Sequence, residues 1–194
     1  MTNPLFYRLS LAACCLALCV IVLGAYVRLS DAGLGCPDWP GCYGQILAPS
    51  AEHEVKQANE AFPERPVETA KAWKEMAHRY LASALGLVIL VLAFLAIKNR
   101  KDPEQSLRLP IVLVAVVCFQ GALGMWTVTM LLKPAIVTLH LLGGMLTLAL
   151  LVWLTASQKL TKNKRLPVSK KLKYWLARSP AKETPMDIRP CVCK

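Results

Sequence analysis

Four long runs of apolar residues constrain the fold of this 194-residue chain more than any other feature. Each run comes close to the roughly 20 residues that an α-helix needs to cross a bilayer, and 55% of all residues are hydrophobic. We therefore predict an all-α integral membrane protein, a four-helix antiparallel bundle. The predicted spans are residues 9–27, 80–97, 109–132 and 135–156.

The first run has an alternative interpretation as a secretory signal peptide, because it follows a short segment with a single charge, Arg8. However, the run is long for the apolar region of a signal peptide, and it lacks a clean small-residue cleavage site. A membrane anchor is the preferred interpretation.

The net charge of +11 is unevenly distributed among the segments between the spans. Lysine and arginine concentrate in segment 98–108 and after Ala156, whereas segment 29–77 is acidic. With four spans, all basic segments fall on one side of the membrane, which is the positive-inside pattern with both termini cytoplasmic. This distribution explains the charge without a nucleic-acid partner.

The segments outside the spans form an outer loop, residues 28–79, and a basic tail, residues 158–194. The first part of the loop is dense in glycine, proline and aromatic residues, which is typical of an ordered, tightly turned lid. From Val67 the apolar positions continue helically into the second span, so this helix should begin before the membrane. Residues 1–157 are thus the predicted membrane bundle, and the unpatterned polar tail is predicted to be a disordered cytoplasmic segment.

The eight cysteines divide by location. Cysteines within apolar spans behave as small hydrophobes, and these are Cys14, Cys15, Cys19 and Cys118. Cys191 and Cys193 lie in the predicted cytoplasmic tail and should be reduced. Cys36 and Cys42 lie in the outer loop, close enough in sequence to bridge if their side chains converge. A disulfide is the preferred interpretation for this pair, and two free thiols are the alternative.

Two histidines, His78 and His140, lie at the same end of two separate predicted spans. An ionisable residue at such a position is a functional candidate, and two imidazoles that converge on one pocket suggest axial ligands of a haem iron. Alternatively, His78 anchors a helix end at the interface, and His140 makes a helix–helix hydrogen bond. If both bind haem, Ala82 and Gly143, each one turn away, should line the pocket.

Charged residues lie beside this pair. Glu75, one turn before His78, could accept a proton or stabilise developing positive charge, or be an ordinary loop acid. Arg28 and Arg79 flank the same mouth and could pair with haem propionates or simply extend to the interface. His53 is most simply a surface residue. No other metal is predicted, because the outer-face residues lack the spacing of a tetrahedral zinc site.

Three motifs together resemble those of one family. Residues 24–45, GAYVRLSDAGLGCPDWPGCYGQ, resemble the signature first outer loop of haem A synthases, which serve cytochrome oxidase assembly in bacteria and mitochondria. EMAHR at 75–79 resembles the Glu-x-x-His-Arg motif of that family, and TLHL at 138–141 is similar to the motif of its second histidine. The resemblance covers roughly residues 5–176.

This resemblance implies an oxidoreductase that converts the C8 methyl of haem O to the formyl group of haem A. It also implies eight spans in two similar halves, of which this chain is the N-terminal half, truncated near Trp175. Haem O would bind between His78 and His140 with Glu75 as an essential acid, and the other half would bind haem b through its own histidines. Paired cysteines like those of the outer loop occur in one branch of the family.

The implied surroundings are the lipid bilayer of a bacterial inner (plasma) membrane, with haem O synthase and a quinone or other redox partner. A homo-oligomer is compatible with this interpretation. Two alternatives belong to other classes: a non-catalytic bis-histidine membrane protein that binds haem or transfers electrons, and a non-functional truncated fragment. Glu75 distinguishes the first alternative, because an electron carrier does not need this carboxylate.

Overall fold

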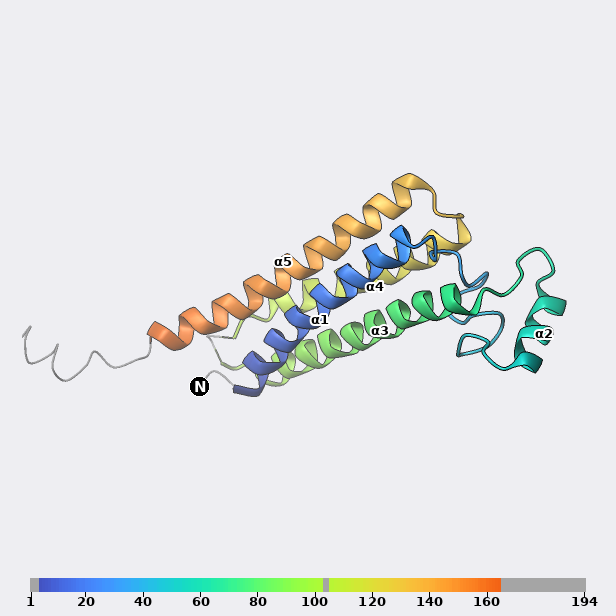
Figure 1. Ribbon diagram of the computed structural model, residues 1–194. Helices are drawn as coiled ribbons and strands as arrows, with labels where there is room; N and C mark the ends of the chain where they lie inside the picture. Colours follow the sequence, from blue (N-terminus) through green and yellow to red (C-terminus); the bar gives the residue numbers. More distant parts are fainter. Residues whose placement is uncertain (1–3, 103–104, 165–194) are drawn as a thin grey trace, which may run out of the picture.

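The computed structural model describes residues 4–102 and 105–164. These residues form five helices (Figure 1), namely α1 (Pro4–Leu29), α2 (Glu52–Ala61), α3 (Thr69–Lys98), α4 (Arg108–Thr129) and α5 (Pro134–Lys164). Within these residues the only β-bridge is an isolated one between Cys42 and Gln45. The predicted all-α class is therefore confirmed.

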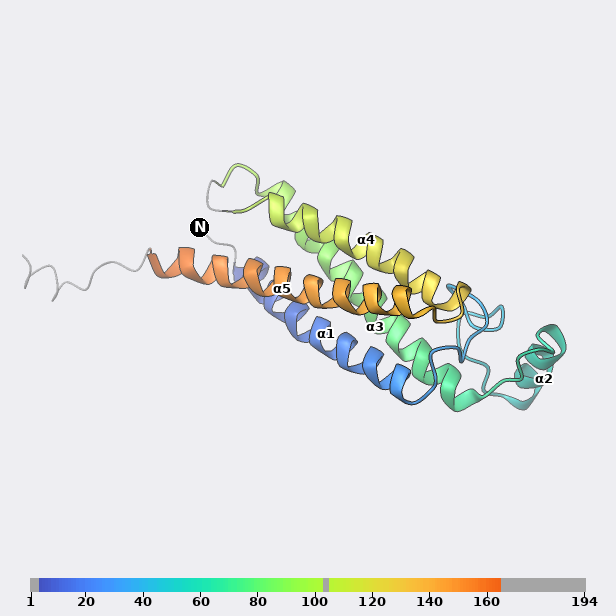
Figure 2. The ribbon, with the colours of Figure 1, turned by 90° about the horizontal axis from the view of Figure 1, so that it is seen from above.

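Helices α1, α3, α4 and α5 form a bundle in which neighbours run antiparallel (Figures 1 and 2). Helices α1 and α4 each contact both α3 and α5, so α1 lies diagonally across from α4, and α3 across from α5. All four helices are long and apolar enough to cross a membrane. No more than 28% of the most apolar window of any of them is buried inside the protein. This outward-facing apolar surface fits a membrane bundle, as predicted.

The segment between α1 and α3, residues 30–68, covers one end of the bundle, and we call it the lid (Figure 1). Helices α3 and α5 both begin at this lid end, whereas α1 and α4 end there. The lid therefore lies at the end of the bundle where α3 and α5 begin, and it contacts the first turns of α3.

The apolar core of the bundle occupies the half that is remote from the lid. Each of the four helices contributes fully or nearly fully buried side chains to this core. They are Phe6, Ala13, Ala17, Leu85, Ile89, Leu92, Ala96, Leu113, Leu151 and Leu154. Along each helix these positions lie away from the lid, so the half of the bundle nearer the lid is packed by other residues.

The helices extend beyond the apolar runs that predicted them, because helical hydrogen bonding does not require apolar side chains. α3 begins at Thr69, before the span at 80, as the helical pattern after Val67 predicts, and its first turns contact the lid. In contrast, α4 ends at Thr129 rather than 132, because Leu131 and Leu132 have φ angles of 53° and 55°, which α-helical backbone does not allow.

Helix α5 begins at Pro134, where proline is favoured because the first helical turn needs no N–H donor, and it continues to Lys164. The predicted boundary between bundle and tail at residue 157 thus falls inside a helix. No proline interrupts residues 157–164, and lysine, leucine and glutamine in this stretch are good helix formers. The predicted disorder of the remaining tail concerns residues that lie outside the described part of the chain.

The lid has a small core of its own. Buried residues of the lid pack against Ala72 and Met76 of α3, and Tyr43 meets Phe62 edge to face, with ring centroids 5.5 Å apart. At the start of α2, the N–H groups of Ser50 and Ala51 donate to Glu54 Oε2, at 2.9 and 3.0 Å. These hydrogen bonds hold the pKa of Glu54 below its ordinary value. The lid is thus an ordered structure, as predicted.

Candidate functional site

His78 of α3 and His140 of α5 face one another across the bundle, although their helices are diagonal and do not touch. Their ring centroids are 6.5 Å apart, and the ring planes are nearly perpendicular, at 83°. In both rings Nδ1 is buried and has no hydrogen-bond partner within the described residues. Because buried polar atoms normally have partners, this pair of rings is a candidate binding site.

Glycines on the other two helices make room for the two rings. A Cβ atom added to Gly24 of α1 would lie 2.8 Å from Cε1 of His78, closer than real Cβ contacts. A Cβ on Gly124 of α4 would lie 3.5 Å from Cε1 of His140. All four helices therefore shape the site. Sequence reasoning missed the role of Gly24, although a glycine near the lid end of an apolar run was a usable signal.

Gly143, expected to line the histidine pocket, instead faces the side chain of Gln120 on α4. A Cβ atom at Gly143 would overlap with Oε1 of Gln120, and Nε2 of Gln120 donates to the carbonyl of His140 at 2.9 Å. The glycine thus lets the Gln120 amide approach the backbone of α5, and this hydrogen bond fixes α4 against the turn that carries His140.

Gln120 also lines an apolar groove of about 460 Å³ between α4 and α5, together with Phe119, Leu142 and Leu146. Its Oε1 is buried without a hydrogen-bond partner within the described residues. The rest of the lining is aliphatic or aromatic, so the groove is suited to apolar groups.

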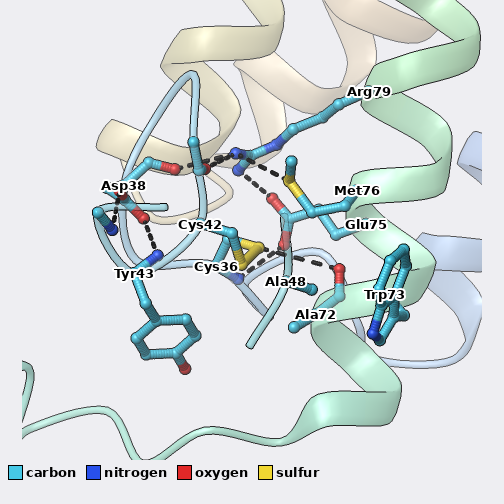
Figure 3. Close-up of a disulfide and its surroundings, with 12 residues drawn as sticks. Cys36, Asp38, Cys42, Tyr43, Ala48, Ala72, Trp73, Glu75, Met76 and Arg79 are labelled. Carbon is cyan, nitrogen blue, oxygen red and sulfur yellow. Dashed lines mark hydrogen bonds and ion pairs between the residues drawn. A yellow bond between two sulfur atoms is a disulfide. The ribbon is translucent and has the colours of Figure 1, made fainter. Parts of the chain in front are cut away.

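Glu75 of α3 is buried, with 4% of its surface exposed, and both carboxylate oxygens are engaged (Figure 3). Oε2 accepts the N–H of Cys36 in the lid at 3.0 Å, and Oε1 lies 2.5 Å from Nη2 of Arg79. A buried carboxylate requires such partners. The structure thus places Glu75 between the helix and the lid, where it links the two.

Arg79 binds the lid as well, and Figure 3 shows its guanidinium among the lid carbonyls. Nη1 donates to the carbonyls of Asp38 at 3.0 Å, Pro40 at 3.3 Å and Gly41 at 2.5 Å. Arg28, predicted to flank the same mouth, is exposed at the end of α1. The two arginines therefore differ: one fastens the lid to α3, and the other has a solvent-accessible side chain.

Cys36 and Cys42 form a disulfide, with Cα atoms 4.8 Å apart, and both residues are completely buried. The preferred interpretation is thus confirmed, and the alternative of two free thiols is wrong for this structure. The Asp38 carboxylate accepts the N–H groups of Tyr43 and Gly44, at 2.6 and 2.8 Å, which stabilises the turn that the disulfide closes.

Gly35 brings this turn against α3. A Cβ atom at Gly35 would lie 2.7 Å from the backbone carbon of Lys71, so only glycine fits at this approach. The close contact positions the N–H of Cys36 for its hydrogen bond to Glu75.

The other predicted thiols and the third histidine lie away from this site. Within the described residues the free cysteines are in the spans, as expected, and they are Cys14, Cys15, Cys19 and Cys118. Cys191 and Cys193 lie outside the described residues. His53 is exposed on α2, in agreement with its interpretation as a surface residue.

Comparison with known proteins gives one consistent result. Residues 7–180 match the model of a family described as cytochrome oxidase assembly protein. A "Heme A synthase" of Shewanella oneidensis is 54% identical over 137 residues, which cover 71% of this chain and 41% of that protein. Proteins of the same name from Agrobacterium fabrum and a Caulobacter strain are 35% and 34% identical, over 70% and 66% of this chain.

The chain spans about two fifths of the length of these relatives, at 41%, 40% and 35%. No solved structure matches the chain.

Proposed function

Because the chain belongs to the family of cytochrome oxidase assembly proteins, we propose that it binds haem O between His78 and His140 as the N-terminal part of a haem A synthase. The proposed reaction oxidises the C8 methyl of this substrate to the formyl group of haem A. The observation that carries the proposal is the pair of imidazoles that face one another from diagonal helices at 6.5 Å.

The two rings fit a shared metal centre by a simple geometric test. Metal–imidazole bonds are about 2.0–2.1 Å long, so two rings that share one ion have centres roughly 6–7 Å apart. The buried and unpartnered Nδ1 atoms support the same conclusion, since both rings have unused hydrogen-bonding or ligating capacity. Gly24 lets the ring of His78 lie directly against α1, and the ring of His140 lies beside Gly124 of α4.

Oxidation of an unactivated methyl group requires redox chemistry, which the iron porphyrin supplies when bound. Amino-acid side chains contribute binding and the movement of protons. The conversion balances when one water supplies the formyl oxygen and the methyl carbon gives up electrons and protons. The electrons need an acceptor outside the described residues, and a quinone or a redox protein is the matching chemical class.

Glu75 is the residue of this chain best suited to handle charge and protons near the histidines. It lies one turn before His78, its Oε1 pairs with the guanidinium of Arg79, and its Oε2 accepts the N–H of Cys36. An ionised carboxylate stabilises positive charge that develops nearby and accepts a released proton. Because one oxygen binds the N–H of Cys36 in the lid and the other binds Arg79, which itself holds the lid, we propose that this role requires a shift of the lid contacts.

The charge distribution supports a location for the site. By the positive-inside rule, the basic residues at the end of the bundle remote from the lid favour a cytoplasmic position for that end and for both termini, in a bacterial cell. The lid and the histidines then lie near the outer surface of the plasma membrane. Haem O synthase is the proposed source of the substrate.

A second candidate is a bis-histidine protein that binds haem without oxidising it. One observation favours it: the Glu75 carboxylate makes a complete set of contacts with the lid and Arg79, which a purely structural role would also explain. The two candidates differ in what removal of this carboxylate should do.

An absorption spectrum of the chain, purified from membranes that contain haem O, tests haem binding. We expect a low-spin bis-imidazole spectrum that His78→Ala and His140→Ala each abolish, while His53→Ala, an exposed control, leaves it unchanged. Unchanged spectra in both site variants would refute the site. Haem extracted from cells with the full-length protein then separates the candidates, because Glu75→Gln should retain the spectrum and stop haem A formation only in an enzyme.

A further inference from the structure

One segment of the lid, residues 46–50, runs along an exposed face of α3. At one end of the segment, Oη of Tyr80 donates to the carbonyl of Ile46 at 2.5 Å. At the other end, Nε1 of Trp73 donates to Oγ of Ser50 at 2.7 Å. Trp73 and Tyr80 are two helical turns apart, so the segment lies lengthwise on the helix, with Ile46 at the end nearer the apolar run.

The α3 face beneath this segment continues directly into the lipid-facing surface of the bundle. Trp73, Tyr80, Leu87 and Phe94 recur every seven residues and therefore lie in nearly one stripe along the helix. Their exposed fractions are 41%, 37%, 63% and 64%. Tryptophan and tyrosine at the end of an apolar stripe are typical of the membrane–water interface. The segment thus lies at the level where α3 enters the bilayer.

Ile46 and Leu47 are the exposed apolar side chains of this segment, at 83% and 54%. Adjacent aliphatic side chains with such exposure need an apolar environment, and exposed apolar patches mark membrane or protein contacts. The free-energy cost of moving the backbone of Ile46 into lipid is reduced, because the hydroxyl of Tyr80 already donates a hydrogen bond to its carbonyl.

We propose that Ile46 and Leu47 insert into the lipid leaflet on the lid side and anchor the lid to the membrane beside α3. The occupant is lipid rather than a protein partner, because the patch is continuous with the exposed apolar stripe of Leu87 and Phe94. This anchor is independent of the function of the histidine site. It complements the polar attachment through Arg79 and Glu75, which holds the lid against α3.

Photo-crosslinking of the whole chain in phosphatidylethanolamine–phosphatidylglycerol vesicles tests the anchor. A benzophenone-bearing phenylalanine replaces Ile46 in one variant and Leu47 in another, and mass spectrometry counts lipid adducts after illumination. The same substitution at Leu87 is the positive control in mid-span, and at Gln57, exposed on α2, the negative control. The presence of the Cys36–Cys42 disulfide in each variant verifies that the lid is folded.

We expect lipid adducts at positions 46 and 47 with yields close to the yield at position 87. We expect no lipid adducts at position 57. Yields at 46 and 47 as low as at 57 would overturn the proposal. So would capture of another polypeptide in place of lipid when the same variants are illuminated in native membranes.

Discussion

At the scale of single residues, the histidine site depends on a side chain that is absent. Gly24 has no Cβ, and the ring of His78 occupies the space in which that atom would lie. Gly86 and Gly121 differ, since a Cβ atom at either would meet nothing within 4 Å. These glycines, in the same bundle, provide matched controls.

Gly24→Ala should displace the ring of His78 and destabilise the protein, because overpacking of a close contact costs about 1–3 kcal/mol. Gly121→Ala should be neutral or stabilising, since alanine in a helix gains roughly 0.5–1 kcal/mol over glycine. Thermal unfolding in detergent measures both effects. Equal destabilisation by the two substitutions would show that contact with His78 is not the cause.

The contacts of the Glu75 side chain also differ from those that the sequence predicts. Helical spacing correctly predicts that Glu75 lies one turn from His78. It does not predict that Oε2 also accepts the N–H of Cys36, because the lid is remote in sequence. Tertiary hydrogen bonds of this kind cannot be derived from one helix alone.

At the scale of elements, the guanidinium group of Arg79 is one of the groups that fasten the lid to α3. Arg79 donates to three lid carbonyls and pairs with Glu75, and only 13% of its side chain is exposed. A planar group with several N–H donors suits this arrangement, and lysine would not replace it.

Arg79→Ala should therefore release the lid and leave the Glu75 carboxylate buried without its ionic partner, at a cost of about 3–5 kcal/mol. Hydrogen exchange of residues 35–45 should accelerate, while the helices remote from the lid stay protected. Lys71→Ala, which removes the more exposed ion pairs of α3 with Asp31 and Glu68 of the lid, is the control and should cost about 0–1 kcal/mol.

The double variant Arg79→Ala with Glu75→Gln checks the cause. It should be less destabilised than Arg79→Ala alone, because the unpaired charge is gone. If the double variant loses as much as the sum of both substitutions, the ion pair is not what fastens the lid.

At the scale of the whole molecule, the lid and the bundle have separate cores. The lid core, which includes Cys36, Cys42 and Tyr43, extends to Ala72 and Met76 at the start of α3. The bundle core lies in the half of the spans away from the lid. Elements with separate cores open with different free energies.

Reduction of the Cys36–Cys42 disulfide should accordingly raise hydrogen exchange in the lid without unfolding the bundle. Exchange measured in detergent with and without reductant tests this expectation, and Cys36→Ala with Cys42→Ala is a variant in which reductant should have no effect. A parallel rise in the core segments of α1 and α5 would contradict the separation.

Much of this architecture could be predicted from the sequence. The apolar runs predict four spans, and the turn-rich composition around Cys36 and Cys42 predicts an ordered lid. Helix ends were less accurate, because the φ angles of Leu131 and Leu132 and the continuation of α5 to Lys164 depend on backbone geometry that hydropathy does not report. The contact between Gly24 and His78 required knowledge of which helices are neighbours.

The diagonal placement of His78 and His140 has a consequence for the order of biogenesis. Chains emerge from the ribosome with the N-terminus first, so the lid, its two cysteines and His78 are all synthesised before His140. The lid can acquire its disulfide while α5 is still inside the ribosome. The facing imidazoles exist only after α5 has joined the bundle, and any ligand that needs both must arrive after α5 has been inserted.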